Sequence, residues 1–220
     1  MRPVNCYGWT MTEPTKLFLI RHGQTDLNRD RRFRGLSDAP LNEAGKYEAA
    51  GAAKLLAAAG ISNIYTSPIR RAAETATAIA VTTGARVETD DDFIDIDYGA
   101  WQGLTVEEVR ERFGPEGLES WRRDPGAFSF PDGDSMESVR ARLQPALLRV
   151  ATAGDEGAVA VVSHLAVLKV CFVTLMDLDF RYFWKVGLDN GSASLFTCKP
   201  DGGFVLERWN EPPMGSHGQG

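Results

Sequence analysis

The chain has 220 residues, of which 43% are hydrophobic and 25% charged, and its formal net charge is −6. This length and composition describe a single globular domain that can bury a substantial core. The acidic balance argues against non-specific binding to nucleic acid, which needs a basic surface, although a local basic cluster can still bind an anion.

The first predicted element is a buried strand at Leu17–Ile20, after a lead-in over residues 1–14 that we expect to be poorly ordered. A helix is predicted from about Asn42, a favourable N-cap residue, to Ala59. A second short strand is predicted at residues 64–66, and Pro68 would begin the next helix at a favoured first-turn position.

In the second half, helices are predicted near Val106–Phe113 and from about Ser135 to Ala151, the latter with Asp134 and Glu137 as a capping box. The continuous apolar run Ala158–Val162 predicts a strand that is buried on both faces. A helix at 167–176 and strands at 192–197 and 204–209 complete a domain over residues 15–210. Residues 211–220 are rich in Pro and Gly and are expected to form a disordered tail.

The apolar stretch from Ala158 to Met176 is long enough to cross a membrane, but it contains His164 and Lys169. A lysine near the centre of a bilayer costs roughly 2.5–3.5 kcal/mol. A buried strand and a core helix account for the same residues without that cost, so we expect a soluble protein. Three cysteines without C-x-x-C spacing and an N-terminus without an apolar signal segment favour a cytoplasmic location.

The alternation of β and α segments predicts an α/β fold, a three-layer α/β/α sandwich with a mostly parallel sheet. In such sheets, ligands bind beyond the carboxyl ends of the strands. The pairs Arg21-His22 and Ser163-His164 each follow a predicted strand, so two of the three histidines in the chain should meet at one edge.

Cleavage of a phosphate monoester without a metal needs a nucleophile, fixed cations and an acid for the departing alcohol. Histidine suits the first task because it is partly neutral near pH 6.5, and arginine offers a planar fork for phosphate oxygens. The chain supplies His22 and Arg21 beside Gly23, which would let backbone N–H groups approach an oxyanion. Arg71 at a helix start and Asp95 before a glycine-containing turn supply a second cation and an acid.

Each of these residues alone also has an ordinary structural interpretation. His164 could be a hydrogen-bonded residue at a strand end, Arg71 a surface ion-pair partner and Asp95 a loop carboxylate. The arginine run over residues 29–34 could be a solvated loop. Their joint occurrence at strand ends and helix starts of one α/β chain favours a phosphate site.

This pattern, from about Leu17 to Trp209, resembles the histidine phosphatase superfamily in its phosphoglycerate mutase-like branch. The segments that look like successive blocks of that family are LFLIRHGQTDLNRDRRFRGLSDAPLNEAGKYEA, YTSPIRRAAETA, FPDGDSMESVRARL and AVVSHLAVLKV. The closing segment FWKVGLDNGSASLF is similar to that of the α-ribazole phosphatase-like members. The resemblance implies a phosphoglycerate mutase-like fold.

The resemblance also implies the roles of the site residues. His22 would be the nucleophile, Asp95 the general acid and base, and Arg21, Arg71 and His164 the phosphate ligands. The residues implied to bind substrate are Thr25, Asn28, Arg32, Arg34, Gly35 and Leu165. The implied activity is that of a metal-independent phosphomonoesterase with no cofactor. It would hydrolyse a small phosphorylated metabolite through a phosphohistidine, as a monomer or homodimer.

The chain departs from the family pattern at three positions. Asp95 stands where the family usually has glutamate, so burial or neighbours such as Asp97 must raise its pKa. Leu165 replaces a common glycine after the second histidine and would alter the mouth of the site. Arg34 replaces a common glutamine, which indicates an additional anionic group on the substrate.

Two other functions remain open. A phosphoglycerate mutase dependent on 2,3-bisphosphoglycerate would share this site, but mutases of the family carry a longer insert between the acid and the second histidine. Only 69 positions separate Asp95 from His164 here, which favours hydrolysis. A non-catalytic protein that binds a phosphorylated ligand is the alternative from a different class.

Overall fold

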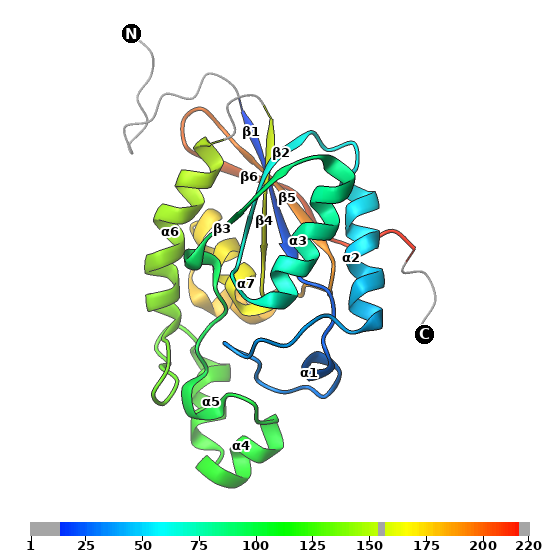
Figure 1. Cartoon of the computed structure of the whole chain (residues 1–220). Helices are drawn as coiled ribbons and strands as arrows, with labels where there is room; N and C mark the ends of the chain where they lie inside the picture. The colour runs from blue at the N-terminus through cyan, green and yellow to red at the C-terminus, as the bar shows by residue number, and fades with distance from the viewer. Residues whose placement is uncertain (1–13, 154–156, 216–220) are drawn as a thin grey trace.

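The computed structural model describes residues 14–153 and 157–215. A six-stranded sheet lies between two layers of helices, seen nearly edge-on in Figure 1. Its spatial order is β3-β2-β4-β1-β5-β6. The strands are β1 (Thr15–Arg21), β2 (Ile61–Thr66), β3 (Arg86–Thr89), β4 (Ala158–Ser163), β5 (Ala193–Cys198) and β6 (Phe204–Glu211). The pairings β2–β3, β2–β4 and β1–β4 are parallel, whereas β5 pairs antiparallel with both β1 and β6. The predicted α/β sandwich with a mostly parallel sheet is therefore confirmed.

Seven helices and three 3₁₀ turns are present in the described ranges. The helices are α1 (Asp26–Arg29), α2 (Glu43–Leu56), α3 (Arg70–Thr83), α4 (Val106–Phe113), α5 (Glu116–Arg123), α6 (Met136–Thr152) and α7 (Leu165–Leu175). The turns are η1 (Asp91–Phe93), η2 (Gly99–Trp101) and η3 (Phe180–Lys185).

The alternation of side chains along β1 divides the core into two parts. Leu17 and Leu19 belong to a cluster formed mainly with α6 and α7, whereas Phe18 and Ile20 pack with α2 and α3 on the other face. Successive residues of a strand point to opposite faces, so an uninterrupted apolar run is required where helices cover both faces. Figure 1 shows α6 and α7 on one side of the sheet and α2 and α3 on the other.

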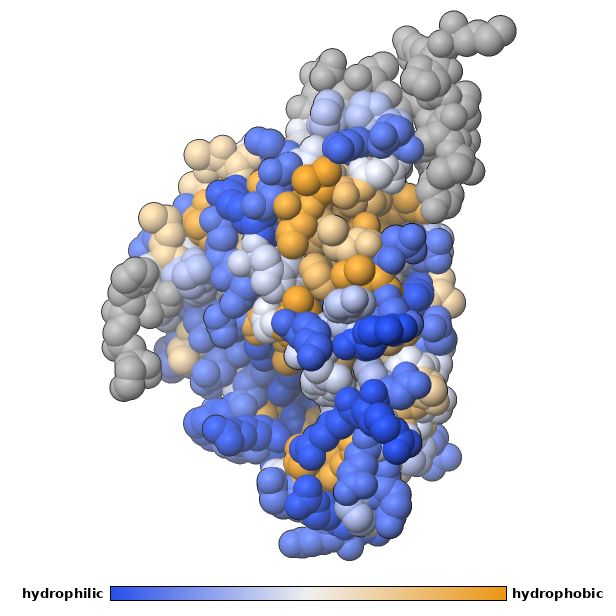
Figure 2. All heavy atoms as spheres, turned by 180° about the vertical axis from the view of Figure 1, so that it is seen from behind, coloured by the Kyte–Doolittle hydropathy of each residue, from blue (hydrophilic) through white to orange (hydrophobic). Residues whose placement is uncertain are grey.

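The helices α4 and α5 lie beyond the end of the sheet to which β1 points (Figure 1). The one buried aromatic residue of these two helices, Trp121, packs against Trp101 and Phe33 below that edge. Figure 2, which shows the molecule from behind, has mostly hydrophilic residues at this lower end and gathers its hydrophobic ones higher up. Trp121 is thus turned inward, toward the edge where a ligand is expected, whereas Phe113 at the end of α4 is exposed.

The start of α6 differs from its predicted capping box. Ser135 and Ser138 form the box, each side chain bonding the backbone of the other, in place of Asp134 and Glu137. Asp134 instead exchanges hydrogen bonds with Asp97: its backbone N–H donates to the Asp97 carbonyl and its carboxylate accepts from the Asp97 N–H. The carboxylate thus holds the loop after Asp95.

Two other predictions concern the ends and the membrane. Residues 211–215, assigned from sequence to the tail, are described and contact α2, where Met214 N–H donates to the Gly51 carbonyl. The predictions for residues 1–13 and 216–220 lie outside the described residues. No helix in the described part of the chain is long and apolar enough to cross a membrane.

Candidate active site

The two predicted histidines meet where β1 and β4 end side by side. The parallel register aligns Arg21 with Ser163, and the N–H of His22 donates to the Ser163 carbonyl at 3.0 Å. The next residue along β4 is His164, the N-cap of α7. The ring centroids of His22 and His164 are 5.1 Å apart, and both side chains are buried.

Arg71 joins the two histidines to the predicted acid. Its Nε lies 3.3 Å from Nε2 of His22 and 3.1 Å from Nδ1 of His164, and its Nη2 lies 2.8 Å from Oδ2 of Asp95. All four side chains are buried. The sequence therefore predicted correctly that these residues come together, although they lie up to 142 positions apart in the chain, from 22 to 164.

The same guanidinium holds the loop that follows α1. Arg71 Nη1 donates to the Ser37 carbonyl at 2.6 Å and Nη2 to the Gly35 carbonyl at 2.9 Å. Gly35 has φ +48°, and a Cβ there would lie 2.4 Å from Oε1 of Gln102. The positive φ thus favours glycine at this turn, and the loop is fixed against Arg71.

The hydrogen bonds define the tautomer of each histidine. Nδ1 of His22 lies 2.6 Å from the Gly23 carbonyl, which can only accept, so Nδ1 carries the proton and Nε2 the lone pair. Nδ1 of His164 faces the Arg71 donor, and its Nε2 lies 2.8 Å from Oγ of Ser67. Each ring therefore accepts from Arg71.

Burial and positive neighbours keep both rings neutral. The pKa of His22 is well below its usual value because of burial, and then because of the charges of Arg71, Arg21 and Arg34. The pKa of His164 is lowered by burial and by Arg71 in the same way. The site therefore presents an unprotonated Nε2 of His22 among cations.

The pKa of Asp95 is shifted in the opposite direction, upward. Burial raises the pKa of its carboxyl, while Arg71 and Arg34 and a hydrogen bond from the Ile96 N–H oppose that rise. Oδ2 of Asp95 also lies 3.5 Å from Nδ1 of His164. Of the two causes expected from the sequence, burial and the neighbouring Asp97, burial is the largest contribution.

Arg21 is buried, and its Nη1 donates to the Leu188 carbonyl. Burial and the charge of Arg34 lower the pKa of its guanidinium to about 10. Arg34 also acts electrostatically on His22, Asp95 and His164, so its charge faces the site.

The other residues predicted to bind substrate lie in different surroundings. Thr25 and Asn28 bond each other in the capping box of α1, immediately after the first histidine motif. Arg32 turns to α4, where Nη1 lies 2.7 Å from Glu108 and 2.8 Å from the Gly103 carbonyl. Leu165, the first residue of α7, is half-buried against the larger core cluster.

Gly23 is needed for a reason other than the predicted one. Its N–H donates to Oγ1 of Thr75 at 3.1 Å and is not aimed at an open site. A Cβ at Gly23 would lie 2.3 Å from the carbonyl oxygen of Gly45, in the first turn of α2. The glycine thus permits α2 to approach the end of β1.

Sequence reasoning missed two residues that orient the histidines. Ser67 receives the Nε2 contact of His164 and accepts from the Ile69 N–H, and Asn190 Nδ2 donates to the His22 carbonyl at 3.0 Å. The only sequence signal for Ser67 is its place between a strand and Pro68. Nothing local distinguishes Asn190 from a loop residue.

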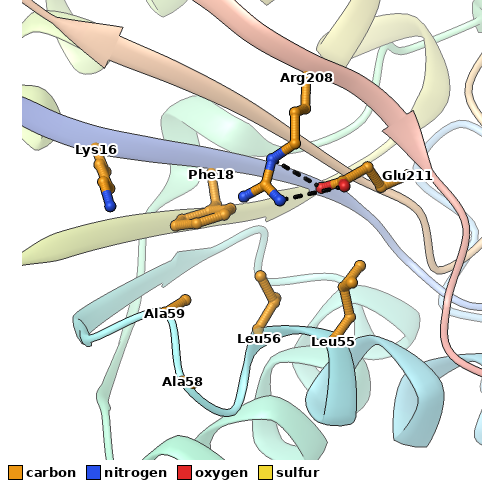
Figure 3. Close-up of a pocket in the computed structure, with 8 residues that line it drawn as sticks. All are labelled: Lys16, Phe18, Leu55, Leu56, Ala58, Ala59, Arg208 and Glu211. Carbon is orange, nitrogen blue, oxygen red and sulfur yellow. Dashed lines mark hydrogen bonds and ion pairs between the residues drawn. The ribbon is translucent and has the colours of Figure 1, made fainter.

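Other parts of the described chain do not offer the same chemistry. No group of three or more His, Cys, Asp or Glu in the described residues is arranged to hold a metal ion. A cavity of about 230 Å³ lies at the opposite end of β1, and its lining includes Lys16, Phe18, Leu55 and Leu56 (Figure 3). Arg208 in this cavity is paired with Glu211 at 3.2 Å. The lining of the cavity contains no histidine, so it does not repeat the cluster of histidines and arginines described above.

Comparison with known proteins gives one matching family model, described as "Histidine phosphatase superfamily (branch 1)", over residues 17–212. Phosphoserine phosphatase 1 of Hydrogenobacter thermophilus is 36% identical over 192 residues, covering 87% of this chain and 90% of the relative.

A solved structure and a further relative extend this comparison. A mycobacterial glucosyl-3-phosphoglycerate phosphatase, solved with VO₃, superposes with a TM-score of 0.81 at 28% identity, covering 89% of this chain and 99% of that one. The 2,3-bisphosphoglycerate-dependent phosphoglycerate mutase of Bartonella tribocorum is 31% identical over 201 residues, covering 84% of this chain and 93% of the relative.

Proposed function

The chain belongs to the histidine phosphatase superfamily, and from this we propose that it is a phosphatase of small phosphorylated metabolites that works through a phosphohistidine on His22. The observation that carries this proposal is the convergence of two neutral histidines, Arg71 and Asp95 in one buried cluster. The phosphatases among its relatives support the same reaction.

His22 is the proposed nucleophile because its Nε2 carries a lone pair and faces the cations. The Nδ1–H bond to the Gly23 carbonyl fixes this tautomer and turns Nε2 toward Arg71. A phosphoryl group is dianionic, so Arg21, Arg71 and Arg34 would offset its charge as the bond forms. For His164 to bond a phosphoryl oxygen as well, its Nδ1, which accepts from Arg71 in the free protein, would have to carry a proton.

Asp95 is the proposed acid and base. Its buried carboxyl already has a raised pKa, and a phosphate dianion arriving beside it would raise that pKa further through like-charge repulsion. The protonated carboxyl would give its proton to the leaving oxygen as the P–O bond breaks and the bond to Nε2 forms. The products of this half are an alcohol, a phosphohistidine and an Asp95 carboxylate.

Water completes the cycle. The Asp95 carboxylate would take a proton from a water molecule as the water oxygen attacks phosphorus and the P–N bond breaks. This step releases inorganic phosphate and returns His22 to its neutral form. No step requires a metal ion or a cofactor.

Of the predicted substrate residues, we propose Arg34, Gly35 and Leu165 as the walls of the substrate site. Arg34 faces the catalytic groups electrostatically, and Leu165 directly follows His164. Thr25 and Asn28 would support the phosphate site from the start of α1. Arg32 would act indirectly, by anchoring α4 through Glu108.

A mutase is the second candidate because a relative with that name covers most of the chain. The segment between Asp95 and His164 is short, and this favours hydrolysis. A short segment would cover less of the site and so leave water freer to reach the phosphohistidine. Addition of 2,3-bisphosphoglycerate to an assay that interconverts 3- and 2-phosphoglycerate tests this candidate directly. Interconversion faster than phosphate release would assign the chain to the mutases.

The experiment for the proposed function compares the wild type with His22→Ala on p-nitrophenyl phosphate, with and without EDTA. We expect hydrolysis that survives the chelator, is inhibited by vanadate and is lost in the variant. Acid-labile ³²P on the wild type after rapid quenching would report the phosphohistidine. Equal, negligible rates for both proteins would favour a non-catalytic binding protein, and restoration of activity by a divalent ion after EDTA would contradict the metal-free mechanism.

We further propose a cellular location and consider the oligomeric state. A cytoplasmic location is supported by the few cysteines, of which Cys171 is a buried thiol. Monomer and homodimer are both compatible with the proposed chemistry, which uses residues of one chain. Analytical ultracentrifugation would distinguish them.

A further inference from the structure

Lys169 is a largely buried lysine that forms no ion pair with any described residue. It lies on α7 and its side chain is only 7% exposed. Its Nζ lies 5.1 Å from the ring centroids of both Phe183 and Trp184. Throughout the described residues, it has no hydrogen-bond acceptor within 3.5 Å and no carboxylate within 4.0 Å. Lys169 Nζ is not among the sealed, unpartnered polar atoms of the described residues, so the stem is buried while the ammonium keeps contact with solvent.

Two arginines in this part of the molecule, unlike Lys169, donate to backbone carbonyls. Arg140 lies over the ring of Phe180 but also donates to the Leu178 carbonyl. Arg142 donates to the carbonyls of Asp92 and Ile94. Among the described residues, the Lys169 ammonium contacts only the faces of Phe183 and Trp184, so its N–H donors are available to water or to a ligand.

The position of Lys169 links it to the proposed active site. Leu165 and Lys169 are four residues apart and therefore neighbours on one face of α7, and Leu165 follows His164 directly. Helical side chains lean toward the helix N-terminus, so the lysine stem reaches back toward the His164 end of α7. Arg21, which precedes His22, is the one charged group of the described chain that acts on the Lys169 ammonium.

We infer that Lys169, with the faces of Phe183 and Trp184, forms a second anion-binding position that holds a carboxylate of the substrate. A single ammonium between two rings matches a monoanion better than a second phosphate, which needs several donors. Trp184 is 40% exposed, so the aromatic wall is open to solvent on one side. The inference rests on the proposed phosphatase function and adds the class of substrate, a phosphorylated carboxylic acid.

The charge state of Lys169 supplies a separate readout. Burial and the Arg21 charge lower the pKa of Lys169 to about 8, and the facing side chains of η3 are uncharged. A lysine with a lowered pKa loses its charge as the pH rises through that value. The KM for a carboxylated substrate should therefore rise above about pH 8, whereas the KM for a neutral analogue should not.

The test uses 3-phosphoglycerate and glycerol 3-phosphate, which differ in a carboxylate against a hydroxymethyl group. We expect the wild type to prefer 3-phosphoglycerate in kcat/KM, and Lys169→Met to reduce that preference about ten- to a hundred-fold, mainly through KM. Lys169→Arg should keep the preference but lose the rise in KM above pH 8, because its charge persists. Lys185→Met, an exposed lysine of η3, is the matched control and should behave as the wild type.

Three results would overturn the inference: a wild type without preference, a Lys169→Met variant that retains it, or a loss that is equal for both substrates. Loss of the preference in Arg34→Gln alone would place the second anion at Arg34. A protein that hydrolyses no phosphate ester would refute the proposed function separately. Calorimetric Kd values for the two ligands on His22→Ala, with and without Lys169→Met, would then decide the role of Lys169 without turnover.

Discussion

Nη2 of Arg71 lies 2.8 Å from Oδ2 of Asp95 within a buried cluster, and the same guanidinium contacts both histidines through its Nε. This ion pair couples the proposed phosphate ligand to the proposed acid. Because phosphate would compete with Asp95 for Arg71, substrate binding would weaken the interaction that favours the carboxylate form. The pair thus provides a physical route by which substrate protonates the acid it needs.

Replacement of the acid should slow the chemical step. We expect Asp95→Asn, which keeps the shape of the side chain, to lower kcat for an alkyl phosphate by about 10²–10⁴-fold. The loss should be smaller for p-nitrophenyl phosphate, whose leaving group needs little protonation. Stopped-time phosphate release measures both, with Asp91→Asn, an exposed residue of η1, as the control. An equal loss for the two substrates would argue against proton donation.

The pH dependence of kcat should identify the same residue. The pKa of Asp95 is raised, and the acid form is active, so kcat should fall as the pH rises through that raised value. The descending limb should be absent in Asp95→Asn. A limb that survives the substitution would assign the titration to another group.

Arginine at position 71 should not be replaceable by lysine. A single ammonium group cannot contact the histidines through one nitrogen and also bond the carbonyls of Gly35 and Ser37. We expect Arg71→Lys to lower kcat/KM by at least about 100-fold and to reduce the melting temperature. The matched control is Arg70→Lys, since Arg70 is exposed and pairs with Glu74 on the helix surface. Near wild-type activity in Arg71→Lys would show that the planar guanidinium group is not needed for the reaction.

The sequence predicted the sheet and the cluster of His22, Arg71, Asp95 and His164 because both depend on strong local patterns. Buried parallel strands require continuous apolar runs such as Ala158–Val162, and residues that follow such strands must meet at one edge. The strand β3 was missed because all four of its residues are exposed and it pairs only with β2 at the sheet edge. The helix α5 was missed because Leu118 and Trp121 are its only buried residues.

Side-chain partners were less predictable because they depend on how loops turn. Arg31 has φ +54°, and the residues that follow it point in different directions: Arg32 lies against Glu108, whereas the charge of Arg34 acts on His22. Neither direction is encoded in the spacing of the arginines. Likewise, only the packing of η3 on α7 shows that the Lys169 ammonium lies against the rings of Phe183 and Trp184.

Glycine at position 23 should be essential for stability and not only for activity. A methyl group there would lie 2.3 Å from the Gly45 carbonyl oxygen, so α2 or β1 must shift. We expect Gly23→Ala to lower the free energy of unfolding by about 1–3 kcal/mol, as overpacking does elsewhere. Gly187→Ala, where nothing lies within 4 Å of the added carbon, is the control in urea denaturation. Equal stability of the two variants would contradict the close approach.

The neutral histidines should make the free energy of unfolding fall with decreasing pH, with a slope that can be calculated. The pKa of His164 is lower in the folded protein than the value of about 6.5 expected when unfolded, so the unfolded state binds the extra proton below that pH. Stability must therefore fall as the pH decreases from 6.5 toward the folded pKa, by about 1.4 kcal/mol per pH unit for each such histidine. His164→Gln should reduce the slope by that amount, and His22→Gln by a similar amount, in urea titrations between pH 7 and 5. Unchanged slopes would mean that the folded and unfolded states bind protons at these rings equally, so that folding does not lower their pKa.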